Sequence, residues 1–203
     1  MIRRLSYDEA GDLLVAGEVV ALPTDTVYGV AASVAHPAAV ARLFALKDRP
    51  ADVALPMMAA SLDQVGDAGV VVTADLARLA VAFWPGALTI VVAAPAELAR
   101  CLGASEPTAG VRVPDDPALR DLLARCGPLA VTSANVHGGE PCESAEQVDA
   151  VFAGRTDLAG VIDGGERRAI VSTVVDVTSR PWRVLREGAI RPDVLGDIES
   201  GPR

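Results

Sequence analysis

The sequence predicts an α/β protein with one mixed β-sheet and helices packed against it. Segments typical of strands and of helices alternate over the first two thirds of the 203 residues, and the final third contains mainly strands. Apolar residues make up 51% of the chain, enough for one substantial core. No repeat, low-complexity tract or linker divides the sequence. We therefore expect one domain over residues 1–190, followed by a loosely attached tail over residues 191–203.

Helix starts are marked by capping residues and prolines along the chain. They are Ser6 with Glu9, His36 with Pro37, Thr73, Asp116 with Pro117, and Ser144 with Gln147. Apolar residues recur at helical spacing after the last four of these signals. The first helix is expected to end near Gly17, the second before Pro50 and the third at Pro85.

The predicted strands are short runs rich in β-branched and aliphatic residues. They cover residues 18–22, 55–59, 87–94, 110–113, 128–131, 160–162, 173–177 and 182–185. The run 87–94 is almost continuously apolar, which is typical of a strand buried on both faces. Because strands alternate with helices early and cluster late, the expected sheet is mixed rather than purely parallel.

The charge balance argues against a protein that binds nucleic acid tightly by itself. Lys and Arg number 18 and Asp and Glu 27, so the formal net charge is −9. Binding to a phosphate backbone normally needs clustered Lys and Arg. An anionic ligand must therefore meet a local group of positive side chains within an acidic surface.

Absent motifs exclude further classes of protein. The chain has neither a P-loop nor a dinucleotide-binding glycine pattern, and it has only two histidines, so no metal site is expected. Its three cysteines form no C-x-x-C pair, which argues against a disulfide framework and a zinc site. No apolar run has the length of a signal sequence or a membrane span, so we expect a cytoplasmic protein with no membrane contact.

Polar residues between positions 23 and 29 are the first candidates for function. Thr24, Thr26 and Tyr28 contribute hydroxyls, and Asp25 contributes a carboxylate, directly after a predicted strand. An ordinary turn, in which Asp25 and Thr26 bond their own backbone, is the alternative explanation.

Two pairs of polar side chains follow at later segment ends. Lys47 and Arg49 are two residues apart where a helix must end, so in extended backbone they can face the same anion. Cations that cap a helix C-terminus are the alternative. Ser133 and Asn135 repeat this spacing after the strand 128–131, where open α/β sheets tend to bind ligands. A turn that closes the strand is the alternative there.

Several runs of sequence, taken together and in order, closely resemble those of the YrdC family. They are PTDTVYG (23–29), LKDRP (46–50), WPGALT (84–89), VRVP (111–114), TSAN (132–135), IDGG (162–165), STVVD (172–176) and LREGAI (185–190). The resemblance extends over residues 18–190 and is to the short single-domain form, without the C-terminal domain of longer members.

The resemblance implies an open, twisted mixed sheet with flanking helices and a deep, positively charged cavity. It implies that L-threonine, bicarbonate and ATP are joined there into threonylcarbamoyl-AMP with release of pyrophosphate, and that Mg²⁺ is carried by the phosphates. The product would pass to a tRNA threonylcarbamoyl-transfer complex for t6A modification, with at most a weak contact to tRNA itself.

Carried over residue by residue, the resemblance assigns two groups of site residues. Those expected to bind ATP are Lys47, Arg49, Thr108, Ser133, Asn135, Cys142 and Arg186, of which Lys47 and Arg49 are the expected catalytic pair. Those expected around threonine and its carbamate are Thr26, Tyr28, Arg112, Val131 through its backbone, and Ser172. The cations would neutralise the charge that develops as pyrophosphate leaves.

The chain departs from the family pattern at several positions near this site. Val53 and Ala54 stand where Lys and Pro are usual, Val171 replaces a Glu, and Met58 occupies a position of the threonine pocket. One lost phosphate contact costs about 1.5 to 3 kcal/mol. A non-catalytic nucleotide- or RNA-binding paralogue therefore stays open as an alternative, and carbamoyl transfer from another carbamoyl adenylate is a third hypothesis.

Overall fold

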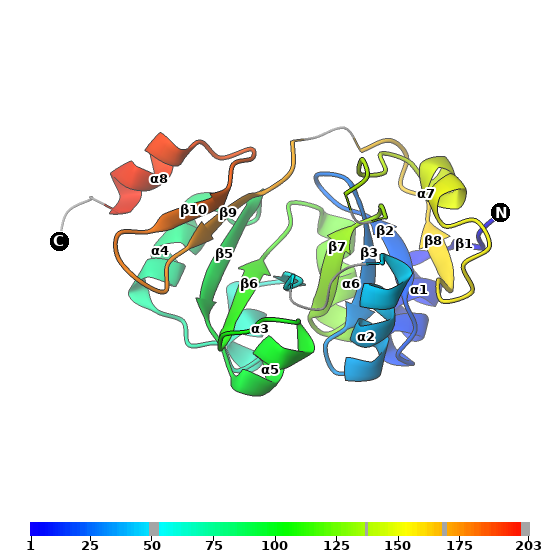
Figure 1. Ribbon diagram of the computed structural model, residues 1–203, viewed down its shortest axis with the longest axis horizontal. Coiled ribbons are helices and arrows are strands. Elements are labelled where there is room, and N and C mark those ends of the chain that lie inside the picture. The colour runs from blue at the N-terminus through cyan, green and yellow to red at the C-terminus, as the bar shows by residue number, and fades with distance from the viewer. Residues whose placement is uncertain (49–52, 137, 168–169, 200–203) are drawn as a thin grey trace.

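One mixed sheet runs through the molecule, as the sequence predicts. The structure is a computed structural model that describes residues 1–48, 53–136, 138–167 and 170–199. Among these residues ten strands form the sheet in the order β1-β8-β2-β3-β7-β4-β6-β5-β9-β10 (Figure 1). The strands are β1 (Arg4–Leu5), β2 (Val20–Pro23), β3 (Tyr28–Ser33), β4 (Met57–Met58), β5 (Leu88–Ala93), β6 (Thr108–Arg112), β7 (Leu129–Ser133), β8 (Gly160–Ile162), β9 (Thr173–Asp176) and β10 (Arg183–Arg186).

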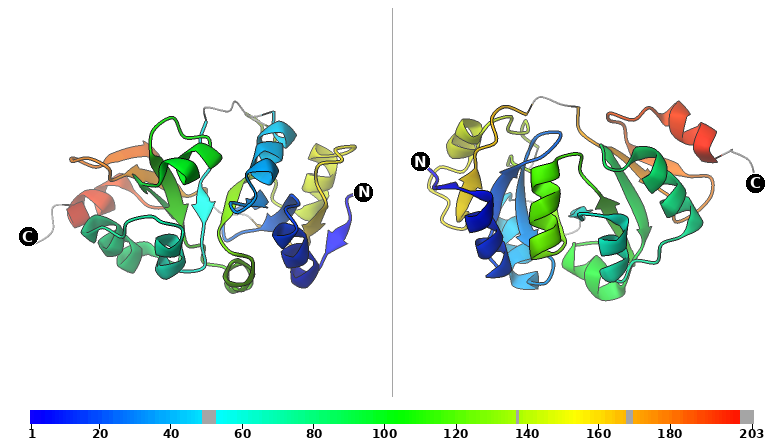
Figure 2. Two further views of the ribbon diagram at one scale, coloured as in Figure 1. Left: turned by 90° about the horizontal axis from the view of Figure 1, so that it is seen from below. Right: turned by 180° about the vertical axis from the view of Figure 1, so that it is seen from behind.

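Helices flank the sheet in two groups, one beside each half. They are α1 (Tyr7–Val15), α2 (Pro37–Leu46), α3 (Leu62–Asp67), α4 (Ala74–Phe83), α5 (Ala96–Cys101), α6 (Pro117–Cys126), α7 (Ala145–Val151) and α8 (Pro192–Glu199). The helices α1, α2, α6 and α7 lie beside the half that ends at β7, and α3, α4, α5 and α8 lie beside the half that begins at β6 (Figures 1 and 2).

The short strand β4 joins the two halves. Met57 and Met58 pair antiparallel with β7 on one side and parallel with β6 on the other. The strand predicted over residues 55–59 is therefore paired only at its centre. Backbone hydrogen bonds of this two-residue strand carry the sheet across the middle of the molecule.

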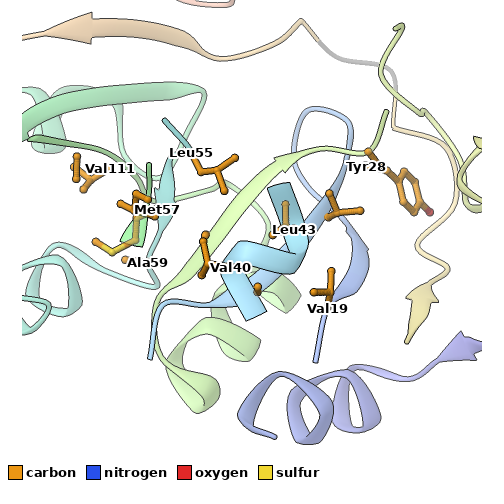
Figure 3. Packing of buried hydrophobic residues seen from close by; sticks show 14 of the residues in the cluster. Val19, Tyr28, Val40, Leu43, Leu55, Met57, Ala59 and Val111 are labelled. Atoms are coloured by element: carbon orange, nitrogen blue, oxygen red, sulfur yellow. The ribbon is translucent and has the colours of Figure 1, made fainter. Parts of the chain in front are cut away.

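Alternate residues of the central strands supply two hydrophobic clusters. Ala21 lies in one cluster and its neighbour Leu22 in the other, because successive side chains of a strand point to opposite faces. Val40 and Leu43 of α2 pack in the first cluster (Figure 3), and Leu14 of α1 packs in the second. Both faces of this half of the sheet are thus covered.

The predicted helix starts agree with the observed ones. The capping box at Ser6 is present, and the side chains of Thr73, Asp116 and Ser144 accept hydrogen bonds at the starts of α4, α6 and α7. Pro37 is the first residue of α2. Local capping chemistry was therefore sufficient to locate these elements.

The sequence analysis missed β1, β3, α3 and α5. The strand β1 has two residues and the helices α3 and α5 six each, too few for a periodic pattern to be recognised. The strand β3 begins inside the segment interpreted as a turn. Its Gly29 suits close strand packing, because a Cβ there would lie 2.8 Å from Cγ1 of Val131 on β7.

Residues 192–199 form the helix α8, although the sequence analysis expected a loosely attached tail after residue 190. Leu195 is buried in the main hydrophobic cluster. The backbone of Trp182 also donates a hydrogen bond to the Glu199 carboxylate at 2.8 Å. Only one side chain of this helix is buried, which explains why its apolar pattern did not stand out.

Candidate functional site

A cavity of about 690 Å³ lies between the two halves of the sheet. Its walls come from the β2–β3 loop, the end of α2, β4, β7 and the loop after it on one side, and from β5, β6, β9 and β10 on the other. Of the described residues that line it, Lys47, Arg112 and Arg186 are cationic and none is acidic. In a chain of net charge −9 this is a local concentration of positive charge.

Lys47 connects the end of α2 to the end of β7. Its side chain is buried, and Nζ donates hydrogen bonds to the backbone oxygen of Ser133 and, at 3.1 Å, to Oδ1 of Asn135. The hydroxyl of Ser133 donates to the same Oδ1. The amide of Asn135 donates to the carbonyls of Val136 at 2.9 Å and Gly139 at 2.7 Å. Lys47, Ser133 and Asn135 are thus brought together, as the sequence predicts.

Arg49 and Cys142 were also predicted to bind ATP. Arg49 lies outside the described residues. Cys142 is buried among the core residues, and only its neighbour Pro141 lines the cavity. Burial raises the pKa of the Cys142 thiol to about 11, although the positive charge of Lys47 acts in the opposite direction. The thiol is therefore neutral and packed rather than available to a ligand.

Arg112 lies at the end of β6, and hydrogen bonds to residues outside the cavity lining fix its side chain. Its Nη2 donates to Oδ1 of Asp25 at 2.8 Å, and its Nε donates to the carbonyl of Gly86 at 3.0 Å. The side chains of Arg112 and Asp25 are only 4% and 10% exposed, so this ion pair is largely shielded from water. Burial lowers the pKa of Arg112 and the Asp25 carboxylate opposes that shift, but a guanidinium stays protonated.

Arg186 occupies the opposite wall, at the end of β10. Its guanidinium donates to the carbonyl of Ser172 at 2.8 and 3.1 Å and to the hydroxyl of Ser172 at 2.9 Å. The Ser172 hydroxyl is also 3.0 Å from that of Thr89. No carboxylate in the described part of the chain forms an ion pair with Arg186. Burial lowers the pKa of Arg186, and the positive charge of Arg112 lowers it further.

The remaining predicted residues line the cavity in different ways. Thr26 is buried, with its hydroxyl 3.0 Å from that of Thr24. Tyr28 lines the cavity too, but its hydroxyl accepts from Gly164 at 3.0 Å and donates to Gly165 at 2.9 Å. Burial raises the pKa of Tyr28. The phenol therefore anchors the segment after β8. Thr108 and Val131 also line the cavity, as do the divergent residues Met58 and Val171.

Sequence reasoning missed the roles of Asp25 and Thr89. The turn explanation for residues 23–29 expected Asp25 and Thr26 to bond their own backbone, but it is the hydroxyl of Thr24 that bonds the backbone of Thr26 and Val27. The explanation does not hold for Asp25, which pairs with Arg112. In the sequence, Asp25 and Arg112 occur in two separate motifs, and nothing in either motif indicates the other. Only the fold brings them together.

The described residues contain no group of three or more His, Cys, Asp or Glu side chains that could hold a metal ion. The same part of the chain contains no helix with the length and apolar character needed to cross a membrane.

Comparison with known proteins gives the family of the chain. The family model for Sua5, YciO and YrdC, which carries the description "Telomere recombination", matches residues 12–188. The chain belongs to the Sua5/YciO/YrdC family. A family relative in Mycobacterium leprae named putative threonylcarbamoyl-AMP synthase is 39% identical and aligns over 92% of this chain and 86% of the relative. The threonylcarbamoyl-AMP synthase of Pyrococcus abyssi is 36% identical over 92% of this chain, which spans only 56% of that relative.

Solved structures of Sua5/YciO/YrdC proteins have the same fold. Pyrococcus abyssi Sua5 complexed with L-threonine superposes with a TM-score of 0.87 at 33% identity, covering 97% of this chain and 58% of that one. Escherichia coli YciO has a TM-score of 0.80 at 26% identity, covering 91% and 90% of the two chains. The predicted family and fold class are therefore confirmed, and the chain spans little more than half of the longer Sua5 proteins.

Proposed function

We propose that this protein is a threonylcarbamoyl-AMP synthase, a nucleotidyl-transferring enzyme that uses L-threonine, bicarbonate and ATP. The observation that carries the proposal is one cavity in which Lys47, Arg112 and Arg186 meet hydroxyl and amide groups from distant parts of the chain. Relatives with this activity in their names cover more than nine tenths of the chain. The non-catalytic alternative has no comparable support.

The chemistry requires two bond-forming steps. The threonine nitrogen attacks the carbon of bicarbonate, and loss of water gives a carbamate. A carbamate oxygen then attacks the α-phosphorus of ATP, and pyrophosphate leaves with the bonding electrons. Because a carbamate oxygen is a weak nucleophile, alignment of the reactants and neutralisation of phosphate charge supply most of the catalysis.

The residues divide between the two substrates. Lys47 and Arg186, with Ser133, Asn135 and Thr108, would bind the nucleotide and its phosphates, and Arg49 stays a predicted member of this group. Arg112 and Ser172, with Thr26 and the backbone of Val131, would surround threonine. Mg²⁺ would arrive on the phosphates and keep water ligands, consistent with the lack of carboxylates among the described residues that line the cavity. Enclosure would protect the carbamate and the acyl adenylate from water.

The product would pass to a tRNA-modifying transfer complex in the cytoplasm, since acyl adenylates hydrolyse quickly when free. Mass spectrometry of a mixture of protein, ATP, Mg²⁺, L-threonine and bicarbonate tests the proposal directly. We expect threonylcarbamoyl-AMP, and we expect exchange of labelled pyrophosphate into ATP only when threonine and bicarbonate are both present. Tight ATP binding without product would instead favour the non-catalytic paralogue.

A further inference from the structure

Asp25 lies behind the cavity wall at the point where three loops meet. Its Oδ1 accepts from Arg112 at 2.8 Å and its Oδ2 accepts from the backbone nitrogen of Asp115 at 3.0 Å. Its neighbours Thr24 and Thr26 line the cavity, whereas Asp25 itself does not. The carboxylate can therefore act on a ligand only through Arg112.

Arg112 is left with one direction for a ligand. Nη2 is bound to Asp25 and Nε to Gly86, and within the described residues Nη1 has no protein partner. Removing Asp25 would leave Nε bound to the Gly86 carbonyl and free Nη2, so that the orientation of the guanidinium is less firmly fixed. A planar guanidinium discriminates between ligands only when its orientation is fixed.

The two arginines of the cavity differ in their net local charge. Arg112 and Asp25 form a shielded pair whose charges cancel. Arg186 is held only by the neutral carbonyl and hydroxyl of Ser172, so its charge is not cancelled by any carboxylate that the structure describes. The binding energy of a polyanion is therefore largest beside Arg186. A zwitterion with a single carboxylate loses less by binding beside Arg112, whose charge Asp25 already cancels.

We propose that Asp25 is a positioning residue that determines specificity: it fixes Arg112 for a single carboxylate and cancels its charge, so that polyphosphate is directed to Arg186 and Lys47. This inference rests on the proposed function, in which the carboxylate belongs to L-threonine and the polyphosphate to ATP. It adds a mechanism that keeps the two anionic substrates from exchanging places in one positively charged cavity.

The unmodified protein provides the first test. Inorganic tripolyphosphate is expected to compete with ATP and not with L-threonine in steady-state kinetics, and the same pattern is expected in calorimetric binding. Competition of tripolyphosphate with threonine in the unmodified protein would overturn the inference. Absence of any threonylcarbamoyl-AMP would instead overturn the proposed function. The calorimetric competition experiment would still test the role proposed for Asp25, because it measures binding and not turnover.

The Asp25→Asn variant gives the second test. We expect KM for L-threonine to rise by about tenfold or more, the loss that follows removal of a charged hydrogen bond, while kcat changes much less. Tripolyphosphate should now also compete with threonine. Asp25→Glu keeps the charge and displaces it, so KM should rise while the new competition stays absent. An Asp25→Asn protein with a normal melting curve, an unchanged KM and no new competition would contradict the proposal.

Asp149→Asn is the matched control. Asp149 binds Arg4 through both carboxylate oxygens, at 3.0 and 2.9 Å, and neither residue lines the cavity. This variant also removes a carboxylate from a partly buried arginine pair. It should therefore lower stability, though by less than Asp25→Asn because this pair is more exposed, and leave KM for threonine and the tripolyphosphate competition unchanged. A similar shift in the control would assign the Asp25 effect to stability alone.

Discussion

Asn135 is the centre of the hydrogen-bond network on the Lys47 side of the cavity. Its Oδ1 accepts from Lys47 and Ser133, and its amide nitrogen donates to the carbonyls of Val136 and Gly139. Acceptor and donor are used at the same time, so only a side-chain amide satisfies all four partners. Asn135 thereby fixes both the buried ammonium and the loop that follows β7.

Asn135→Asp tests this double role, because it leaves the acceptor and converts the donor into a second acceptor. Two carbonyl oxygens would then face a carboxylate oxygen, and we expect a loss of stability of about 1 to 3 kcal/mol. The affinity for ATP should fall as the loop after β7 moves. Ser133→Ala removes only one of the donors to Oδ1 and should cost less in thermal unfolding. Equal stability of Asn135→Asp and the unmodified protein would show that the loop does not depend on this amide.

At the residue scale the sequence predicted which side chains lie together better than it predicted which atoms they bond. Lys47, Ser133 and Asn135 could be placed in one site because their motifs occur in the family order. The pairing of Asp25 with Arg112 could not, because it joins positions 87 residues apart through a buried contact. Tyr28 was assigned to threonine, yet its hydroxyl bonds the glycines after β8. Such choices between two nearby partners depend on packing, which a one-dimensional pattern does not record.

At the scale of elements, the segment after β10 holds the start of β9 in place. Ala189 donates to the carbonyl of Val171 at 3.0 Å, and Thr173 exchanges hydrogen bonds with the backbone of Ile190. Gly188 comes so close that a Cβ there would lie 2.3 Å from the Val171 carbonyl oxygen. These contacts position Ser172 and therefore also the guanidinium that binds it.

Gly188→Ala is expected to destabilise the protein by about 1 to 3 kcal/mol, as overpacking does, because the nearest atoms are backbone and cannot rotate away. Turnover should fall with it, since Ser172 is displaced. Gly196→Ala in α8 is the matched control: a Cβ there meets nothing within 4 Å, and alanine favours a helix. Chemical denaturation of both variants gives the comparison, and a Gly188→Ala protein as stable as the Gly196→Ala protein would contradict the packing.

Element prediction from the sequence succeeded where a local signal exists. Capping residues located α1, α4, α6 and α7. It failed where pairing alone defines the element, as in β1, whose two residues are a strand because β8 lies beside them. The strand predicted over residues 55–59 exists, but only Met57 and Met58 pair with β6 and β7. The helix α8 was missed for a related reason: its order depends on Leu195 reaching the core and on contacts to residues far away in the chain.

At the scale of the whole molecule, negative charge dominates, whereas the charged residues that the structure describes in the cavity lining are all cations. The chain carries 27 acidic and 18 basic residues, and cations that line the cavity are held by buried hydrogen bonds. Small anions such as ATP can reach them. A nucleic-acid backbone would meet a molecule with a net charge of −9.

This charge distribution predicts that the protein alone does not hold tRNA. Non-specific binding to nucleic acid depends on releasing counterions with surface Lys and Arg, and a molecule with a net charge of −9 offers little of that gain. Fluorescence anisotropy with labelled unmodified tRNA, at about 0.15 M salt, should give no saturable binding below about 100 µM, the weak end of non-specific affinities. ATP should bind under the same conditions, which serves as the control for an active preparation. Micromolar tRNA binding that weakens steeply with salt would reveal a basic surface and would remove the need for a separate tRNA-binding partner in the hand-off of the product.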